Sequence, residues 1–204
     1  MANTCFNQIK ITGSQKDLTK IYDAIKKALE DNESSFSWLE ASDFLELFGI
    51  KKKNIPSDLR EAITDIKEIQ DGVLKISSES SWNFKPDIWR ALRTVFHDID
   101  IYYLAEEFGC EIFVTNDTTE TMFPVKYALD FDFEGYPEPG VNYFNSEEEL
   151  LDFCRKVFKK NYRSAEEVEK KLDDWLRENS EDNFAVLHEI EYAEDDTDLW
   201  CEQD

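Results

Sequence analysis

Three carboxylates alternate with apolar residues in the stretch YALDFDFEGY, residues 127–136: these are Asp130, Asp132 and Glu134. An extended chain sends successive side chains to opposite faces, so the three carboxylates are expected to share one face. Carboxylate oxygens are the ligands that Mg²⁺ and Mn²⁺ prefer, and a divalent ion held by them can support phosphodiester hydrolysis. One hypothesis for this segment is therefore a metal-dependent phosphodiesterase or nuclease site.

Spacing and surroundings argue against that metal site. Residues i and i+2 lie about 6.6 Å apart along a strand, so adjacent carboxylates share an ion only if their rotamers converge. Glu189 and Glu191 near the end of the chain are possible further ligands, but this half of the chain has few Lys or Arg residues to hold a phosphate substrate. We therefore expect no metal, no cofactor and no catalytic residue, and we keep the metal site as an alternative.

The whole chain is strongly acidic, with 46 acidic and 23 basic residues among 204 and a formal net charge of −23. Residues 120–204 hold 25 acidic and 9 basic residues, so most of the excess lies in the second half. A protein that contacts nucleic acid or an anionic membrane normally presents Lys and Arg. We therefore expect neither nucleic acid nor a membrane as a direct partner, and we expect a basic protein instead.

The expected binding surface combines the alternating strand with the acidic end of the chain. Residues 193–204, AEDDTDLWCEQD, contain no basic residue, and their tryptophan is expected to fold back on the body or to anchor a partner. A regular array of carboxylates presents to a basic protein what a nucleic-acid backbone presents. The surface predicted from the sequence consists of Asp130, Asp132, Glu134, Glu189, Glu191, Glu194, Asp195, Asp196 and Trp200.

Other catalytic signatures are missing from the sequence. The chain has no G-x-x-x-x-G-K-[ST] or G-x-G-x-x-G phosphate-binding pattern and no G-x-S-x-G nucleophile pattern. Its four cysteines are scattered without a C-x-x-C pair, and neither His97 nor His188 completes a zinc-type spacing. The sequence therefore favours a non-enzymatic protein with reduced thiols.

Hydrophobic periodicity predicts an α+β protein whose first domain spans residues 1–119. A strand at 5–12 precedes a helix capped by Ser14, Asp71-Gly72 forms a hairpin turn, Pro86 begins a helix near 86–97, and two strands follow. Residues 31–62 are treated as an insertion, with a short helix that ends at Gly49 and another in DLREAI. The resulting order β-α-β-β-α-β-β predicts a ferredoxin-like fold.

Residues 120–192 are expected to form a smaller acidic α+β domain, followed by an acidic tail at 193–204. Strands are predicted at 124–134 and 184–192, with a short strand at VNYF between them. Two helices begin after Ser146 and Ser164, each of which has a Glu three residues later in the capping-box pattern. We expect these helices to cover antiparallel strands, which leaves the acidic face of the sheet exposed.

Two short segments resemble the YubB-like ferredoxin-fold proteins of plasmids and phages. They are MANTCFNQIKITG and ESSWNFKPDIW, and the resemblance covers about the first 117 residues. One departure is Thr4, which stands where that family usually has Trp. The resemblance implies a ferredoxin-like fold and an origin on a mobile element, and it brings no catalytic residues. The residues that carry it are Asn3, Cys5, Asn7, Gly13, Trp82 and Pro86.

Such an origin, combined with the negative charge, predicts an inhibitor of host defence. The protein would act as a nucleic-acid mimic that occupies the nucleic-acid channel of a restriction or CRISPR nuclease. An adaptor module that recruits a partner through its acidic tail is a further alternative beside the phosphodiesterase. The N-terminus shows no basic stretch followed by an apolar run, and no apolar segment is long enough to span a bilayer, so we expect a cytoplasmic protein of a bacterial host.

Overall fold

The computed structural model describes residues 3–31, 38–55, 59–133, 140–180 and 182–193. Contacts divide this part of the chain into two compact units. The first unit contains residues 3–122 together with Tyr192 and Ala193, and the second unit is Phe123–Glu191. Each unit combines a β-sheet with helices, so the predicted α+β class is confirmed.

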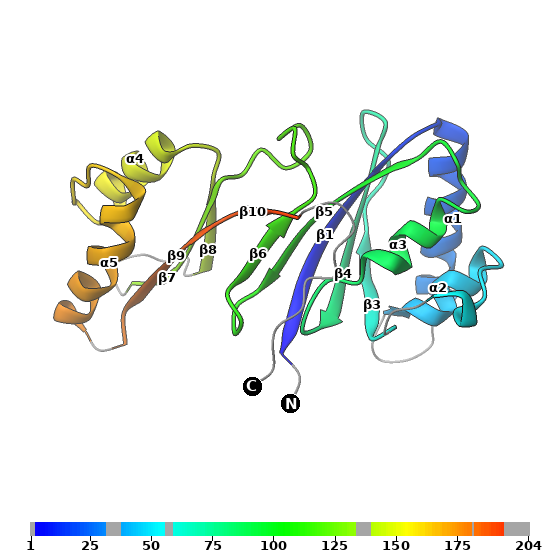
Figure 1. The fold of residues 1–204 in the computed structure, drawn as a ribbon, viewed down its shortest axis with the longest axis horizontal. Coiled ribbons are helices and arrows are strands. Elements are labelled where there is room, and N and C mark those ends of the chain that lie inside the picture. Colours follow the sequence, from blue (N-terminus) through cyan, green and yellow to red (C-terminus); the bar gives the residue numbers. More distant parts are fainter. Residues whose placement is uncertain (1–2, 32–37, 56–58, 134–139, 181, 194–204) are drawn as a thin grey trace. The chain divides into compact units, whose positions relative to one another are not determined.

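A seven-stranded sheet forms the body of the first unit (Figure 1). Its strand order is β10-β6-β5-β1-β4-β3-β2, and each adjacent pair from β6 to β2 is antiparallel. The strands are β1 (Thr4–Thr12), β2 (Leu39–Glu40), β3 (Glu61–Ile66), β4 (Val73–Ser81), β5 (Asp100–Glu107), β6 (Ile112–Thr115) and β10 (Glu191–Tyr192).

Helices α1 (Gln15–Asp31), α2 (Ala41–Leu47) and α3 (Pro86–Leu92) lie together on one side of this sheet (Figure 1). A 3-10 turn, η1 (Lys52–Asn54), follows α2. Helix α1 begins where predicted, because the Ser14 hydroxyl accepts the Asp17 N–H at 3.2 Å. The apolar stripe of α1 packs on the alternate strand residues that face it, and this burial holds the unit together. Among the buried core residues are Ile9, Ile11, Leu18, Ile21, Ile25, Leu74, Trp89 and Leu92.

The hairpin predicted at Asp71-Gly72 is confirmed, with φ angles of 52° and 75° that suit a primed turn between antiparallel strands. The helix expected in DLREAI is wrong, because β3 already begins at Glu61. Pairing with β4 buries alternate residues of this segment, and such tertiary pairing overrides local helix preference. Val73 at the start of β4 and Ile112 at the start of β6 are only half-buried.

The second unit has a three-stranded antiparallel sheet of order β8-β7-β9, with helices α4 and α5 on one side (Figure 1). The hydroxyls of Ser146 and Ser164 cap the two helices by accepting N–H groups three residues later, as predicted. The strand expected at 184–192 is shorter, since Ile190 separates it from β10. The elements are β7 (Tyr127–Asp132), β8 (Gly140–Phe144), α4 (Glu147–Val157), α5 (Ala165–Asn179) and β9 (Phe184–Glu189).

The cysteines differ in state. Cys5 and Cys154 are free and buried, whereas Cys110 is disulfide-bonded. The expectation of reduced thiols is therefore wrong for Cys110. No helix in the described part of the chain combines the length and the apolar character that crossing a bilayer requires.

Candidate functional site

Strand β7 carries its aspartates where the alternation predicts. Leu129 and Phe131 are fully buried in the core of the second unit, and Asp130 and Asp132 point to the other face of the strand. Asp132 is exposed and Asp130 is half-buried. Glu134, the third carboxylate of the predicted set, lies outside the described residues.

The neighbours of Asp130 make this face less acidic than expected. Asp130 lies between Val141 on β8 and Val186 on β9. Partial burial raises the pKa of Asp130, whereas the nearby charge of His188 lowers it. The face therefore mixes valine, aspartate and histidine instead of presenting a continuous row of carboxylates.

Glu189 lies directly opposite Tyr127 in the pairing of β7 with β9. Paired residues point to the same face of a sheet, and Tyr127 shares its face with Leu129. The prediction that Glu189 joins Asp130 and Asp132 on one face is therefore wrong, although the two strands are neighbours as that prediction required.

Of the other predicted residues, Glu191 alone lies in the described part of the chain, and it does not belong to the three-stranded sheet. Glu191 is exposed, but it lies on β10 in the seven-stranded sheet. Among the described residues, no three His, Cys, Asp or Glu side chains form a group that could hold a metal ion. The predicted tail residues Glu194, Asp195, Asp196 and Trp200 lie outside the described residues.

Glu189 instead lines a pocket of about 430 Å³ at the N-terminal ends of α4 and α5. Half of the residues that line it are glutamates, contributed by both helices and by β9. The lining residues include Glu147, Glu166, Glu169 and Glu189, together with Tyr127. We call this the acidic pocket.

Two of the four glutamates in the acidic pocket already have partners. Glu147 accepts the backbone N–H of Ala165 at 2.7 Å, which ties the first turn of α4 to the start of α5. Glu166 forms an ion pair with Lys170 at 2.5 Å. Within the described part of the chain, Glu169 and Glu189 have no ion-pair partner.

The electrostatic effect of these glutamates appears at Tyr127. Burial raises the pKa of Tyr127 and the charges of Glu189 and Glu147 raise it further, whereas the charge of Lys126 lowers it. The pocket therefore opposes a negative charge and favours a positive one. The sequence showed the acidic first turns of both helices, but the meeting of those turns with β9 depends on tertiary packing that local patterns do not reveal.

A second candidate site lies in the first unit, where polar side chains replace the apolar core at one end of β1, β3 and β4. The Asn7 amide donates to the hydroxyls of Ser78 and Ser80 at 3.2 and 3.0 Å. Ser78 in turn donates to Glu61 Oε1 at 2.6 Å, and Cys5 Sγ donates to Asn7 Oδ1 at 3.2 Å. All five residues are buried.

Glu61 is the charged centre of this cluster and is only 3% exposed. Its Oε1 accepts from Ser78 and from the Trp89 indole N–H at 2.8 Å, whereas its Oε2 has no hydrogen-bond partner in the described structure. Burial raises the pKa of Glu61 to about 7. The hydrogen bonds from Ser78, Trp89 and the Lys85 backbone and the charge of Lys85 all act to lower it.

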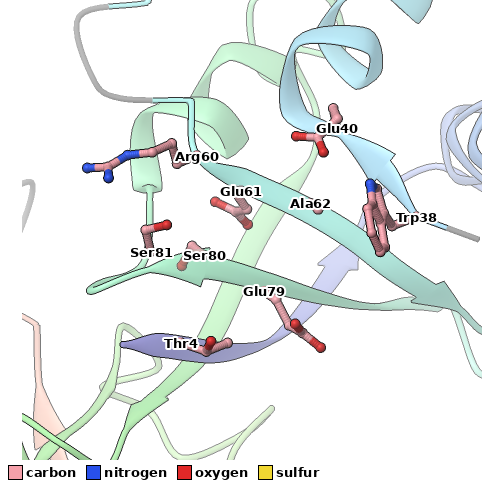
Figure 2. A pocket seen from close by; sticks show the side chains of 9 residues that line it. All are labelled: Thr4, Trp38, Glu40, Arg60, Glu61, Ala62, Glu79, Ser80 and Ser81. Atoms are coloured by element: carbon pink, nitrogen blue, oxygen red, sulfur yellow. The ribbon is translucent and has the colours of Figure 1, made fainter. Parts of the chain in front are cut away.

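Glu61 also lines a pocket of about 330 Å³, which Figure 2 shows at close range. We call it the Glu61 pocket. Glu61 was not among the predicted site residues, because the sequence places it in an expected helix of the insertion. Only the pairing of β3 with β4 places its side chain beside that of Ser80. The residues around the pocket include Trp38, Glu40, Arg60, Glu61, Glu79 and Ser80.

The two segments that carry the family resemblance meet at this end of the sheet. The Trp82 N–H donates to the Asn3 carbonyl at 2.9 Å, and Asn7 binds Ser80. Trp82 has a φ angle of 70°, a left-handed conformation that is uncommon for an aromatic residue. Strained backbone of this kind tends to occur at functional sites.

Comparison of the chain with protein-family models, with curated proteins and with solved structures gives no match. The function therefore has to be inferred from the geometry and charge of these two sites.

Proposed function

We propose that this chain is a non-enzymatic acidic binding protein that engages a basic protein through the acidic pocket of its second unit. The observation that carries this proposal is the convergence of four glutamates on one pocket, two of which, Glu169 and Glu189, have neither an ion pair nor a side-chain hydrogen bond among the described residues. A pocket of about 430 Å³ has room for a Lys or Arg side chain. The four glutamates are themselves exposed, and their closeness at one pocket concentrates negative charge that attracts such a cation.

The rest of the second unit's surface adds to the attraction. The basic residues of α5 pair within their own helix at spacings of four residues, so they do not neutralise other carboxylates. The exposed side chains of Glu148, Asp174 and Glu178 have no ion pair within the described residues. An excess of one sign steers a partner of the opposite charge toward the pocket. The pairs within α5 are Lys170 with Glu166, Lys171 with Glu167 and Arg177 with Asp173.

The proposed partner is a protein that normally binds nucleic acid, because its Lys and Arg residues are closely spaced and already suited to fixed negative charge. A host restriction or CRISPR nuclease is the instance favoured by an origin on a mobile element. The order β5-β1-β4-β3, with α1 and α3 on one side, supports the ferredoxin-like arrangement that the resemblance implies.

Capture from a bacterial lysate tests this function. The full chain is immobilised and the lysate is applied at low salt, at high salt, and at low salt with excess duplex DNA. We expect a basic protein that is retained at low salt and released by either salt or DNA. A chain that retains no basic protein under these conditions, or retains one that DNA does not displace, would contradict the proposal.

A further inference from the structure

We propose that the Glu61 pocket binds a guanidinium group, carried either by a small molecule or by an arginine side chain. The site belongs to the first unit and is independent of the acidic pocket. Its volume of about 330 Å³ lies within the range of small-molecule sites.

One carboxylate oxygen of Glu61, Oε2, is buried without a hydrogen-bond partner in the described structure. A buried carboxylate oxygen normally has a hydrogen-bond donor, since removing it from water without one is unfavourable. Within the described structure, Glu61 Oε2 has no donor in hydrogen-bond geometry, while Oε1 already accepts from Ser78 and Trp89. The Lys85 backbone N–H also stabilises the charged carboxylate, but it does not satisfy Oε2. A ligand N–H group at the pocket would supply the missing bond.

Acidic residues outnumber basic ones in the lining of the Glu61 pocket. Glu40 and Glu79 join Glu61 around the pocket, and neither has an ion-pair partner among the residues described. Arg60 is the basic member of the lining, and Figure 2 shows its guanidinium extending away from the other labelled side chains. The exposed carboxylates of Glu40 and Glu79, together with Glu61 once the pH passes its pKa of about 7, outweigh the one guanidinium of the lining and favour a cationic ligand.

The Trp38 side chain gives the Glu61 pocket an aromatic surface. Trp38 is 40% exposed although it is a large apolar residue, and it lies at the side of the pocket away from Arg60 (Figure 2). A planar guanidinium stacks on an indole and still directs N–H donors sideways toward carboxylates. A quaternary ammonium ion also interacts with an indole, but it has no N–H to offer to Glu61.

Calorimetric titration of the full chain tests the site with four probes. Agmatine carries a free guanidinium, acetyl-arginine amide carries the same group as a side chain, and acetyl-citrulline amide is its neutral isostere. Tetramethylammonium is the cation without donors. We expect agmatine, acetyl-arginine amide or both to bind, and the citrulline and tetramethylammonium probes to fail. Agmatine alone indicates a small-molecule ligand, and binding of the arginine amide indicates a side chain. Failure of both guanidinium probes, or equal binding of the citrulline probe, overturns the proposal.

Variants then locate the binding. Glu61→Gln should weaken guanidinium binding by about tenfold or more, the factor that corresponds to one hydrogen bond to a charged group. Arg60→Gln should leave the affinity unchanged or raise it, because it removes a like charge. If Glu61→Gln does not fold, two substitutions at exposed positions of the lining, Trp38→Ala and Glu79→Gln, test the site instead. Each should weaken guanidinium binding. Unchanged affinity in the folded Glu61→Gln variant, or in both exposed variants, overturns the proposal.

Discussion

Tyr127 and Glu189 face each other across strands β7 and β9, which places Glu189 on the side of the three-stranded sheet opposite to Asp130 and Asp132. Because side chains alternate along a strand, a difference of one residue in register moves a carboxylate from one face to the other. Glu189 therefore joins Glu147, Glu166 and Glu169 around the acidic pocket at the N-terminal ends of α4 and α5, and it does not join Asp130 and Asp132.

This pairing predicts a change in the titration of Tyr127. The charge of Glu189 raises the pKa of the Tyr127 hydroxyl, since a nearby carboxylate disfavours the phenolate. Glu189→Gln should therefore lower the pKa of Tyr127, as measured by NMR titration of its ring carbons. Asp132→Asn is the matched control, because Asp132 lies on the other face and should leave that pKa unchanged. A lower Tyr127 pKa in Asp132→Asn, with no change in Glu189→Gln, would contradict this register.

The N-terminal caps of α4 and α5 lie at the helix ends that form the acidic pocket, and their contribution to stability can be measured. Ser164 caps α5 by accepting the Glu167 N–H at 3.3 Å. Ser164→Ala should lower the free energy of unfolding of the second unit by about 1 kcal/mol, as measured by urea denaturation. Ser164→Asp should retain most of the stability because aspartate also caps helices. An equal loss in both variants would show that the cap is not the source of the effect.

Much of the fold could be predicted from local patterns. The caps at Ser14, Ser146 and Ser164 and the turn at Asp71-Gly72 are signals that involve only a few neighbouring residues, and each is found in the structure. Strand β3 was missed because the Glu61 segment reads as helix locally and becomes a strand only through its pairing with β4.

The candidate sites were less predictable, for the same physical reason. Alternation correctly placed Asp130 and Asp132 on one face of β7, but cross-strand register decides what Glu189 adds to them. Glu61 was not predicted as a site residue, because its burial and its hydrogen bonds with Ser78 and Trp89 depend on other elements of the fold.

Burial of Glu61 predicts a pH-dependent stability difference. The pKa of its carboxyl rises from 4.5 to about 7 on folding, so the folded state holds this proton more tightly. The corresponding stability is fully present below about pH 4.5 and is lost as the pH rises through about 7. Glu61→Gln has no such proton. Relative to the parent, the variant should gain up to about 3 kcal/mol across this window.

Urea unfolding of the parent and of Glu61→Gln at several pH values checks this prediction. The difference between their free energies of unfolding is the relevant quantity, since the other titrating groups are common to both chains. A difference that stays constant with pH would show that Glu61 titrates as an ordinary exposed glutamate does.

The two free cysteines are predicted to be unreactive in the folded protein. Burial raises the pKa of Cys5 and of Cys154 to about 12 in each case, so almost no thiolate is present at neutral pH. Iodoacetamide should leave both thiols unmodified in the native chain and should alkylate both after denaturation, as measured by peptide mass spectrometry. Rapid modification of Cys5 in the native chain would contradict this prediction, because it would show that the thiol is accessible and ionised.

The central claim is that the acidic pocket, and not the overall negative charge, selects a basic partner. Its most direct test compares lysate capture by the parent with capture by two variants of equal net charge. Glu169→Gln with Glu189→Gln alters the pocket, whereas Glu148→Gln with Glu178→Gln removes the same charge from exposed positions outside the pocket lining. We predict that the salt-sensitive basic protein retained by the parent is lost from the pocket variant and kept by the control variant. Equal retention or equal loss in the two variants would contradict the claim.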